Sequence, residues 1–315
     1  MLKLKLFLAL LVVSTCTKAA VSDTNYIEEH VTLHTSKGDI FGTLLLPATG
    51  KKVPVAMLIA GSGPTDRDGN NPFAMNGGLK KLAYALIEKN IATLRYDKRA
   101  IGESAAAGGK ESDLRFTDYV NDAKGWIELL KKDKRFSSVT VIGHSEGSLI
   151  GMIAAKHGAD KYISIAGVGV TADSIIKIQL ADQPKAIRDM VYPRLDTLKR
   201  GDTLKNVSPM LYSLFRPGIQ PYMISWMAYD PQKEIARLDI PVLIIQGTND
   251  IQVSVDDAYL LKKADPKADF LLIKNMNHIF RIVTGDKNEN AKTYNEASLP
   301  LAAELISGIT NFILK

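Results

Sequence analysis

The stretch VTVIGHSEGSLIGMIAA, residues 139–155, places a serine between two glycines directly after an apolar run. Its residues 143–147, GHSEG, match the pattern G-x-S-x-G, and the residues that follow have helical spacing. A strand that turns sharply into a helix at such a serine exposes the hydroxyl group, where it can act as a nucleophile. Because the pattern also arises by chance, the prediction that Ser145 is a nucleophile depends on the rest of the chain.

An aspartate and a histidine in the C-terminal part of the chain have the positions expected of the acid and the base. Asp250 follows the apolar run PVLIIQG, and His278 follows FLLIKN, so each comes just past a predicted strand. The carboxyl ends of parallel strands meet at one edge of a sheet, and both side chains can therefore converge on Ser145. Asp256 and Asp257 are alternative acids, but both fall inside the helix predicted to follow.

Acyl transfer at Ser145 would also need N–H donors for the negative charge that develops on the substrate oxygen. One expected donor is the backbone N–H of Glu146, the residue after the serine. The other is expected in the loop LIAGSGPTDRDGN, residues 58–70, with Ser62 as first choice. The glycines beside Ser62 permit an unusual backbone, which is also what an ordinary turn would require.

The rest of the chain alternates short apolar runs with segments of helical spacing. The runs suit strands that are buried on both faces of a parallel sheet, and they span residues 53–61, 91–97, 137–143, 161–167, 240–247 and 268–275. Helical spacing covers residues 78–89, 117–132, 147–157, 255–263 and 299–313. An alternating stretch before them, residues 30–47, predicts an antiparallel hairpin. The pattern favours an α/β fold with a mostly parallel sheet.

The region between about residues 168 and 235 breaks this alternation. It has helical spacing, many aromatic residues and no strand signal, so we expect a helical cap over the carboxyl edge of the sheet. The expected organisation is a leader (1–19), a first core part (20–167), the cap (168–235) and a second core part (236–315). Six cap side chains are candidates for lining a substrate pocket or, alternatively, for packing the cap onto the sheet: Tyr212, Phe215, Tyr222, Met223, Trp226 and Met227.

The first residues have the layout of a secretory leader. Lysines come first, and the apolar run from Leu6 to Val13 is too short to cross a bilayer. Small residues follow, and cleavage is expected near Ala19 or Ala20. Cys16, the single cysteine, offers lipid attachment as an alternative. The sequence therefore predicts an exported protein, periplasmic or secreted, with a lipoprotein as the alternative.

The composition argues against several kinds of partner. The chain has 315 residues, of which 46% are hydrophobic and 23% charged, as in an ordinary globular protein. Its formal charge of +6 includes three lysines of the leader, so removal of the leader would leave +3. Without a basic run that has interleaved aromatic residues, nucleic acid is not an expected partner. No cluster has zinc-ligand spacing, and neither a metal nor another cofactor is expected.

Three ordered motifs, GSGPTDRDG (61–69), RYDKRAIGES (95–104) and GHSEG, together resemble those of the α/β-hydrolase superfamily. Within it, the motifs resemble those of bacterial esterases and S9/S33-peptidase-like hydrolases, and the resemblance runs from about residue 26 to the C-terminus. The resemblance implies an α/β-hydrolase fold and a serine hydrolase. One departure is Ala60, where many relatives have histidine, and another is Ala100, where glycine is usual.

The same resemblance implies roles for the site residues. Ser145 would be the nucleophile, His278 the general base and then the general acid, and Asp250 the residue that orients the histidine. The expected function is cleavage of carboxylic esters with small or medium acyl groups, and the expected partner is a small-molecule ester. A serine peptidase or amidase with the same triad is one alternative. A catalytically silent binding protein on the same fold is another, although the intact triad counts against it.

Overall fold

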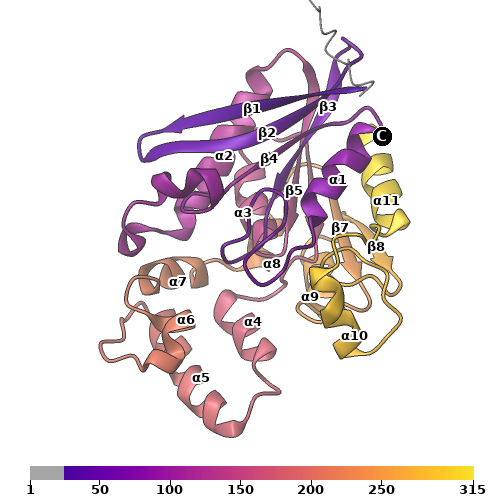
Figure 1. Ribbon diagram of the computed structural model, residues 1–315. Coiled ribbons are helices and arrows are strands. Elements are labelled where there is room, and N and C mark those ends of the chain that lie inside the picture. Colours follow the sequence, from indigo (N-terminus) through magenta and orange to yellow (C-terminus); the bar gives the residue numbers. More distant parts are fainter. Residues whose placement is uncertain (1–24) are drawn as a thin grey trace, which may run out of the picture.

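The computed structural model describes residues 25–315, which form a sheet covered by helices on both faces, with a further group of helices at one end (Figure 1). The expected leader, its cleavage site and Cys16 lie outside the described residues. Within residues 25–315, no helix combines the length and the hydropathy that a membrane span requires.

The sheet has eight strands among the described residues. They are β1 (Tyr26–Thr35), β2 (Gly38–Pro47), β3 (Val53–Ile59), β4 (Ala92–Tyr96), β5 (Phe136–His144), β6 (Lys161–Ile165), β7 (Val242–Gly247) and β8 (Asp269–Ile273). Their order in space is β1-β2-β4-β3-β5-β6-β7-β8. β1 and β2 form an antiparallel hairpin, β2 is antiparallel to β4, and all later neighbours are parallel. The predicted hairpin and the mostly parallel sheet are confirmed.

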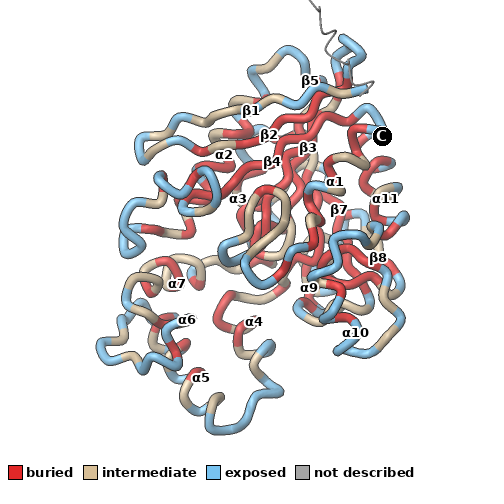
Figure 2. The backbone as a smooth tube through the Cα atoms, in the orientation of Figure 1, coloured by how far each residue is buried: buried red, intermediate tan, exposed pale blue. Residues whose placement is uncertain are grey.

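Alternate residues of the parallel strands face opposite layers of helices. In β3, Val55, Met57 and Ile59 belong to one hydrophobic core, while Ala56 and Leu58 belong to a second core on the other face. All five are at most 1% exposed. Figure 2 shows the same burial along the neighbouring strands, with the exposed residues gathered in loops and helix surfaces. Since both faces are covered, most positions of such a strand are apolar, which explains the apolar runs in the sequence.

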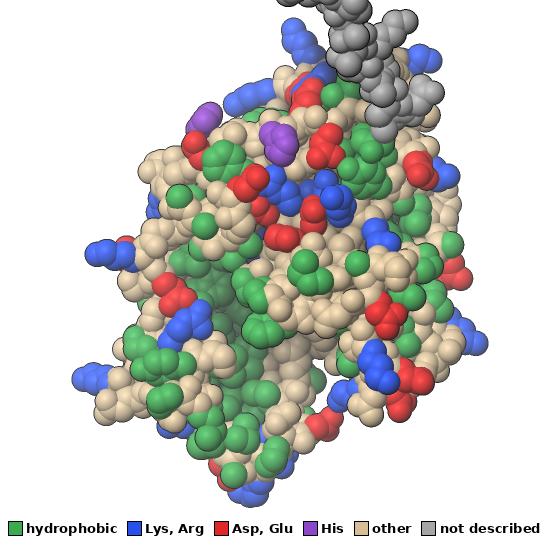
Figure 3. All heavy atoms as spheres, in the orientation of Figure 1, with side chains coloured by type: hydrophobic (Ala, Val, Ile, Leu, Met, Phe, Trp, Pro, Cys, Tyr) green, Lys and Arg blue, Asp and Glu red, His purple; other side chains and the backbone are tan. Residues whose placement is uncertain are grey.

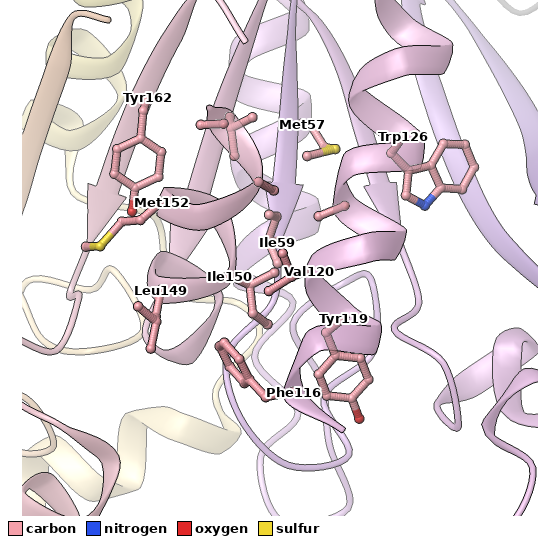
Figure 4. Close-up of a cluster of buried hydrophobic side chains, with 14 of the residues drawn as sticks. Met57, Ile59, Phe116, Tyr119, Val120, Trp126, Leu149, Ile150, Met152 and Tyr162 are labelled. Carbon is pink, nitrogen blue, oxygen red and sulfur yellow. The ribbon is translucent and has the colours of Figure 1, made fainter. Parts of the chain in front are cut away.

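Four helices cover most of the two faces. One core contains buried residues of α2 (Phe116–Lys132) and α3 (Glu146–Ala155), and the other contains those of α1 (Gly78–Ile87) and α11 (Ala303–Leu314). Figure 4 shows how side chains of α2 and α3 pack against β3 in the first core, among them Phe116, Trp126, Leu149, Ile150 and Met57. The remaining elements outside the cap are α9 (Val255–Ala264), α10 (Lys287–Lys292), η1 (Gly102–Gly108), η2 (Glu111–Asp113) and η4 (Thr293–Asn295).

The segment between β6 and β7 contains helices and no strand. These helices are α4 (Ala172–Gln179), α5 (Lys185–Lys199), η3 (Pro209–Leu211), α6 (Tyr212–Phe215), α7 (Gln220–Met227) and α8 (Pro231–Ile235). α4 to α7 gather at one end of the molecule, and they are called the cap here (Figure 1). The cap rests on α2, where Phe116 stacks on Trp226 with ring centroids 6.2 Å apart.

Candidate active site

Ser145 lies at the sharp turn between β5 and α3. Its backbone has φ 55° and ψ −122°, a conformation that residues with a side chain rarely adopt. A Cβ at Gly143 would come within 2.3 Å of the carbonyl oxygen of Gly147, and a Cβ at Gly147 within 2.4 Å of that of Ile59. Both glycines are therefore needed for the close backbone approach that holds the serine in its strained conformation.

The predicted base and acid are in direct contact. His278 Nδ1 lies 2.8 Å from Asp250 Oδ2, and the two side chains are 5% and 1% exposed. Asp250 Oδ1 also accepts hydrogen bonds from the backbone N–H groups of Gln252 and Val253. Burial alone would raise the pKa of Asp250, but the contact with His278 and these N–H groups outweigh it and lower the pKa. A buried carboxylate in this position fixes the orientation of the imidazole and stabilises its protonated form.

Ser145 and His278 line the same pocket, which has a volume of about 100 Å³. Its walls come from residues 61–79, 144–145 and 278–280, together with Gln252 and Tyr294. None of the described lining residues is Asp, Glu, Lys or Arg. Apart from its two histidines, the pocket beside the serine is therefore lined by uncharged polar and apolar groups.

One neutral polar group of this pocket, the side chain of Asn76, is only 4% exposed. Its Oδ1 accepts a hydrogen bond of 2.9 Å from the backbone N–H of Gly78. The backbone oxygen of Asn76 accepts from Arg281, which fixes this part of the loop. No group among residues 25–315 accepts a hydrogen bond from Asn76 Nδ2, so the amide leaves a donor for a molecule in the pocket.

The two residues predicted as oxyanion donors are both adjacent to Ser145. Glu146 is the first residue of α3, and Ser62 lines the pocket with the serine. Gly61, which precedes Ser62, lies so near that a Cβ added there would be 3.2 Å from the Cβ of Ser145. The loop after β3 and the N-terminus of α3 therefore approach the serine from two sides.

Parts of the chain match a family model and several proteins in sequence. A family model described as serine aminopeptidase, S33, matches residues 75–204. Esterase EstD of Thermotoga maritima is 28% identical over 258 residues, which are 80% of this chain and 60% of EstD. The chain thus spans less than two thirds of EstD. An uncharacterized protein of Mycobacterium tuberculosis is 25% identical over 262 residues, 71% of this chain and 72% of that protein.

Solved structures with this fold include esterases. Est1E from Butyrivibrio proteoclasticus, in a structure with bound ferulic acid, superposes with a TM-score of 0.62 at 16% identity over 90% of this chain and all of Est1E. The esterase Pf2001 of Pyrococcus furiosus has a TM-score of 0.56 at 14% identity, over 92% of each chain. The α/β hydrolase GrgF from Penicillium sp. sh18 has a TM-score of 0.59 at 15% identity, over 91% of this chain and 98% of GrgF.

The chain has the α/β-hydrolase fold. The strand order, the antiparallel hairpin and the helical segment between β6 and β7 all agree with the fold expected from its motifs.

No signal in the sequence had pointed to a buried ion pair beside Ser145. Lys98 Nζ lies 3.1 Å from Glu146 Oε2, and the two side chains are 1% and 2% exposed. Lys98 also donates a hydrogen bond of 2.5 Å to the carbonyl oxygen of Gly61. The hydroxyl group of Tyr222, in the cap, donates a hydrogen bond to Glu146 Oε1. Burial and then the Glu146 carboxylate raise the pKa of Tyr222 well above its ordinary value, so the hydroxyl stays protonated and can donate.

His144 was assigned no role from the sequence, yet it contacts the candidate base. Its Nε2 donates a hydrogen bond of 2.9 Å to the backbone oxygen of His278, and the two ring centroids are 4.6 Å apart. Burial, and next the neighbouring His278, lower the pKa of His144 to about 3. His144 is therefore neutral near pH 7, and its hydrogen bond helps to hold the loop that carries His278.

The pocket beside Ser145 takes none of its lining from the six predicted cap side chains. Four of them are buried in the hydrophobic core: Phe215, Tyr222, Met223 and Met227. Tyr212 is 46% exposed, and Trp226 stacks on Phe116 of α2. The four buried side chains pack in the same hydrophobic core as α2 and α3. A hollow lined by hydrophobic side chains lies between the cap and the rest of the molecule (Figure 3).

Proposed function

We propose that this protein is a serine esterase that cleaves neutral carboxylic esters through an acyl-enzyme intermediate. The observation that carries the proposal is the hydrogen bond between His278 and Asp250 at a pocket that also contains Ser145 on its strained turn. A nucleophile, a base within reach and an orienting acid are the parts that acyl transfer to a serine requires.

The proposed reaction assigns one step to each residue. Ser145 Oγ attacks the ester carbonyl carbon while His278 Nε2 accepts the hydroxyl proton, and Asp250 stabilises the imidazolium. The N–H groups of Ser62 and Glu146 donate to the oxyanion. His278 then gives the proton to the departing alcohol oxygen, which leaves an acyl-enzyme. A water molecule then attacks the acyl carbonyl carbon while His278 accepts its proton. His278 returns that proton to Ser145 Oγ, and the carboxylic acid is released.

The pocket supports an ester rather than a peptide as substrate. The family model described as a serine aminopeptidase makes a peptidase the second candidate. An aminopeptidase must bind the α-ammonium group of its substrate, and a carboxylate is the usual partner of a buried cation. No acidic residue lines the described pocket, and the buried Glu146 carboxylate is already paired with Lys98.

The acyl group is proposed to be small or medium and apolar. The hydrophobic hollow between the cap and the body supports this assignment, because burial of a hydrocarbon chain there would contribute to binding (Figure 3). The donor of Asn76 would bind an oxygen of the ester or of its alcohol part.

The test is a substrate panel on the purified full-length protein and its Ser145→Ala variant. p-Nitrophenyl esters of increasing acyl length are compared with aminoacyl anilides. We expect ester turnover that is lost in the variant, with little or no anilide turnover. Anilide turnover that exceeds ester turnover would make the protein a peptidase. No Ser145-dependent turnover of either class would leave the silent binding protein.

We also propose, from the leader alone, that the protein is exported. The mass of the mature protein from its native membrane and periplasmic fractions tests this. Cleavage near Ala19 or Ala20 is the expected result, a lipid mass on Cys16 would establish the alternative, and an uncleaved chain would contradict export.

A further inference from the structure

Lys98 connects the two loops that carry the proposed oxyanion donors. It follows β4, Gly61 follows β3, and Glu146 follows the serine after β5. These strands are adjacent in the order β4-β3-β5, so the lysine reaches across the carboxyl end of β3 to contact both neighbours. The ring of Tyr119, with its centroid 5.1 Å from Nζ, covers the ammonium group from a further side.

The contact with Gly61 acts directly on one donor. The carbonyl group of Gly61 and the N–H of Ser62 belong to the same peptide unit, which is planar and trans, so the two groups point in opposite directions. When Lys98 binds the oxygen at 2.5 Å from the buried side, the N–H of Ser62 is directed to the other side. The ammonium group also polarises the peptide unit, which strengthens the N–H as a donor.

The contact with Glu146 acts on the other donor. Glu146 contributes its backbone N–H, and its carboxylate is held by Lys98 on one oxygen and by Tyr222 on the other. The side chain therefore fixes the first residue of α3 relative to the loop after β3. Tyr222 belongs to α7, so the position of Glu146 also depends on the position of the cap.

Resting on the proposed function, we propose that Lys98 is a positioning residue of the oxyanion hole, which aligns the N–H groups of Ser62 and Glu146, and that Tyr222 couples this alignment to the cap. A buried ion pair contributes little net stability, because removal of two charges from water offsets their attraction. Positioning of the oxyanion donors would explain why the Lys98–Glu146 pair is buried despite the free energy needed to remove its charges from water.

The molecule provides a matched control in the next residue. Arg99 forms an equally buried pair with Asp122 of α2, with side chains 4% and 3% exposed and Nη2–Oδ1 at 2.5 Å. This pair contacts neither Ser145 nor the residues beside it. The double variant Arg99→Met/Asp122→Asn therefore removes a buried pair of the same kind without acting on the proposed donors.

The experiment compares this control with Lys98→Met, with Lys98→Met/Glu146→Gln and with Tyr222→Phe. The double variant of the site removes both charges, so it folds even where an unpaired Glu146 carboxylate would prevent folding. Active sites are counted by titration with a fluorophosphonate. kcat and KM are measured per active site, together with the inhibition constant of a trifluoromethyl ketone, which forms a tetrahedral oxyanion on the serine.

We expect both Lys98 variants to lower kcat at least ~10-fold and to weaken the ketone by a similar factor, with KM changed less than ~3-fold. Tyr222→Phe should produce a smaller change, ~3-fold, in the same direction. The Arg99 control should keep kcat and ketone affinity within ~2-fold of wild type, whatever the change in its thermal midpoint.

Two results would overturn the inference while leaving the esterase intact. One is a pair of Lys98 variants with wild-type kcat and ketone affinity per active site. The other is a loss in the Lys98 variants that is confined to thermal stability and to the number of active sites. If the wild type itself neither reacts with the fluorophosphonate nor cleaves esters, the proposed function fails, and the inference fails with it.

Discussion

The carboxyl edge of the sheet and the cap are held by different kinds of contact. Around Ser145, backbones approach so closely that an added Cβ at Gly147 would lie 2.4 Å from a carbonyl oxygen. The cap instead rests on α2 through aromatic rings, as where Trp226 stacks on Phe116. Close backbone contacts tolerate no extra atom, whereas side chains in a core can repack. Substitutions at the edge should therefore alter the chemistry, and those under the cap should mainly alter stability.

The largest effect is expected from Gly147→Ala. The new methyl group would meet the carbonyl oxygens of Ile59 and Ala60 at 2.4 and 2.6 Å. We expect a loss of at least ~3 kcal/mol in the free energy of unfolding, or no folded protein, with no esterase activity. Chemical denaturation checks this. Gly158→Ala is the control, because nothing lies within 4 Å of its added Cβ and only its positive φ adds strain. Equal stability of the two variants would contradict the comparison.

Asp250→Asn should abolish most of the activity while leaving the fold unchanged. The amide can no longer accept the Nδ1–H of His278 as a carboxylate does, so the reactive tautomer and the imidazolium lose their support. We expect kcat to fall about 10³–10⁴-fold with little change in the thermal midpoint. A fall of less than about tenfold would remove Asp250 from the proposed triad.

Phe116→Ala tests the cap side of the comparison. The ring is fully buried and contacts Tyr222, Trp226 and Tyr229 of the cap region. Its removal should cost about 3 kcal/mol in the free energy of unfolding, with kcat per active site reduced far less than in Asp250→Asn. Phe116→Leu keeps most of the buried volume, so its free energy of unfolding should lie between those of Phe116→Ala and the wild type. A kcat as low as that of Asp250→Asn would show that the cap contact is part of the chemistry.

His144→Gln should change how stability depends on pH. His144 has its pKa lowered from 6.5 to about 3, so between these values the unfolded chain binds a proton that the folded chain excludes. Stability should therefore fall as the pH falls through this range, by at most ~1.4 kcal/mol per pH unit from this group. Glutamine does not titrate and can still donate to the oxygen of His278. Urea unfolding at several pH values should give a shallower acid decline for the variant, and identical slopes would contradict the assignment.

The smallest effect is expected from Ala100→Gly. Ala100 has φ 70°, in the left-handed region where a Cβ is unfavourable. Glycine there should raise the free energy of unfolding by about 1 kcal/mol, less the entropy that glycine adds to the unfolded chain. A lower thermal midpoint for the variant would show that the Cβ packs usefully against Gly108.

The fold could be predicted because a local sequence pattern marks each strand and helix of the core. Continuous apolar runs marked the strands, and residues just past them, such as Asp250 and His278, come together at one edge once the strands are parallel. The strain at Ala100 also had a sequence signal, since glycine is usual at that place in the motif.

Other features could not be read from the sequence because they depend on distances across the fold. Lys98 and Glu146 lie 48 positions apart, and their contact requires that β3 lies between β4 and β5. The cap aromatics have the same composition whether they line a pocket or pack on α2. In the structure Trp226 stacks on Phe116, and the position of Phe116 is fixed by α2.

Ser145 is proposed to be an activated nucleophile, and mapping of a fluorophosphonate adduct tests this proposal. Folded wild-type protein is labelled, digested with trypsin and analysed by mass spectrometry. We expect the adduct on Ser145, within the peptide that spans residues 136–156, and no adduct on heat-unfolded protein. Folded protein that carries no adduct on Ser145, or that carries it on another residue, would contradict the account.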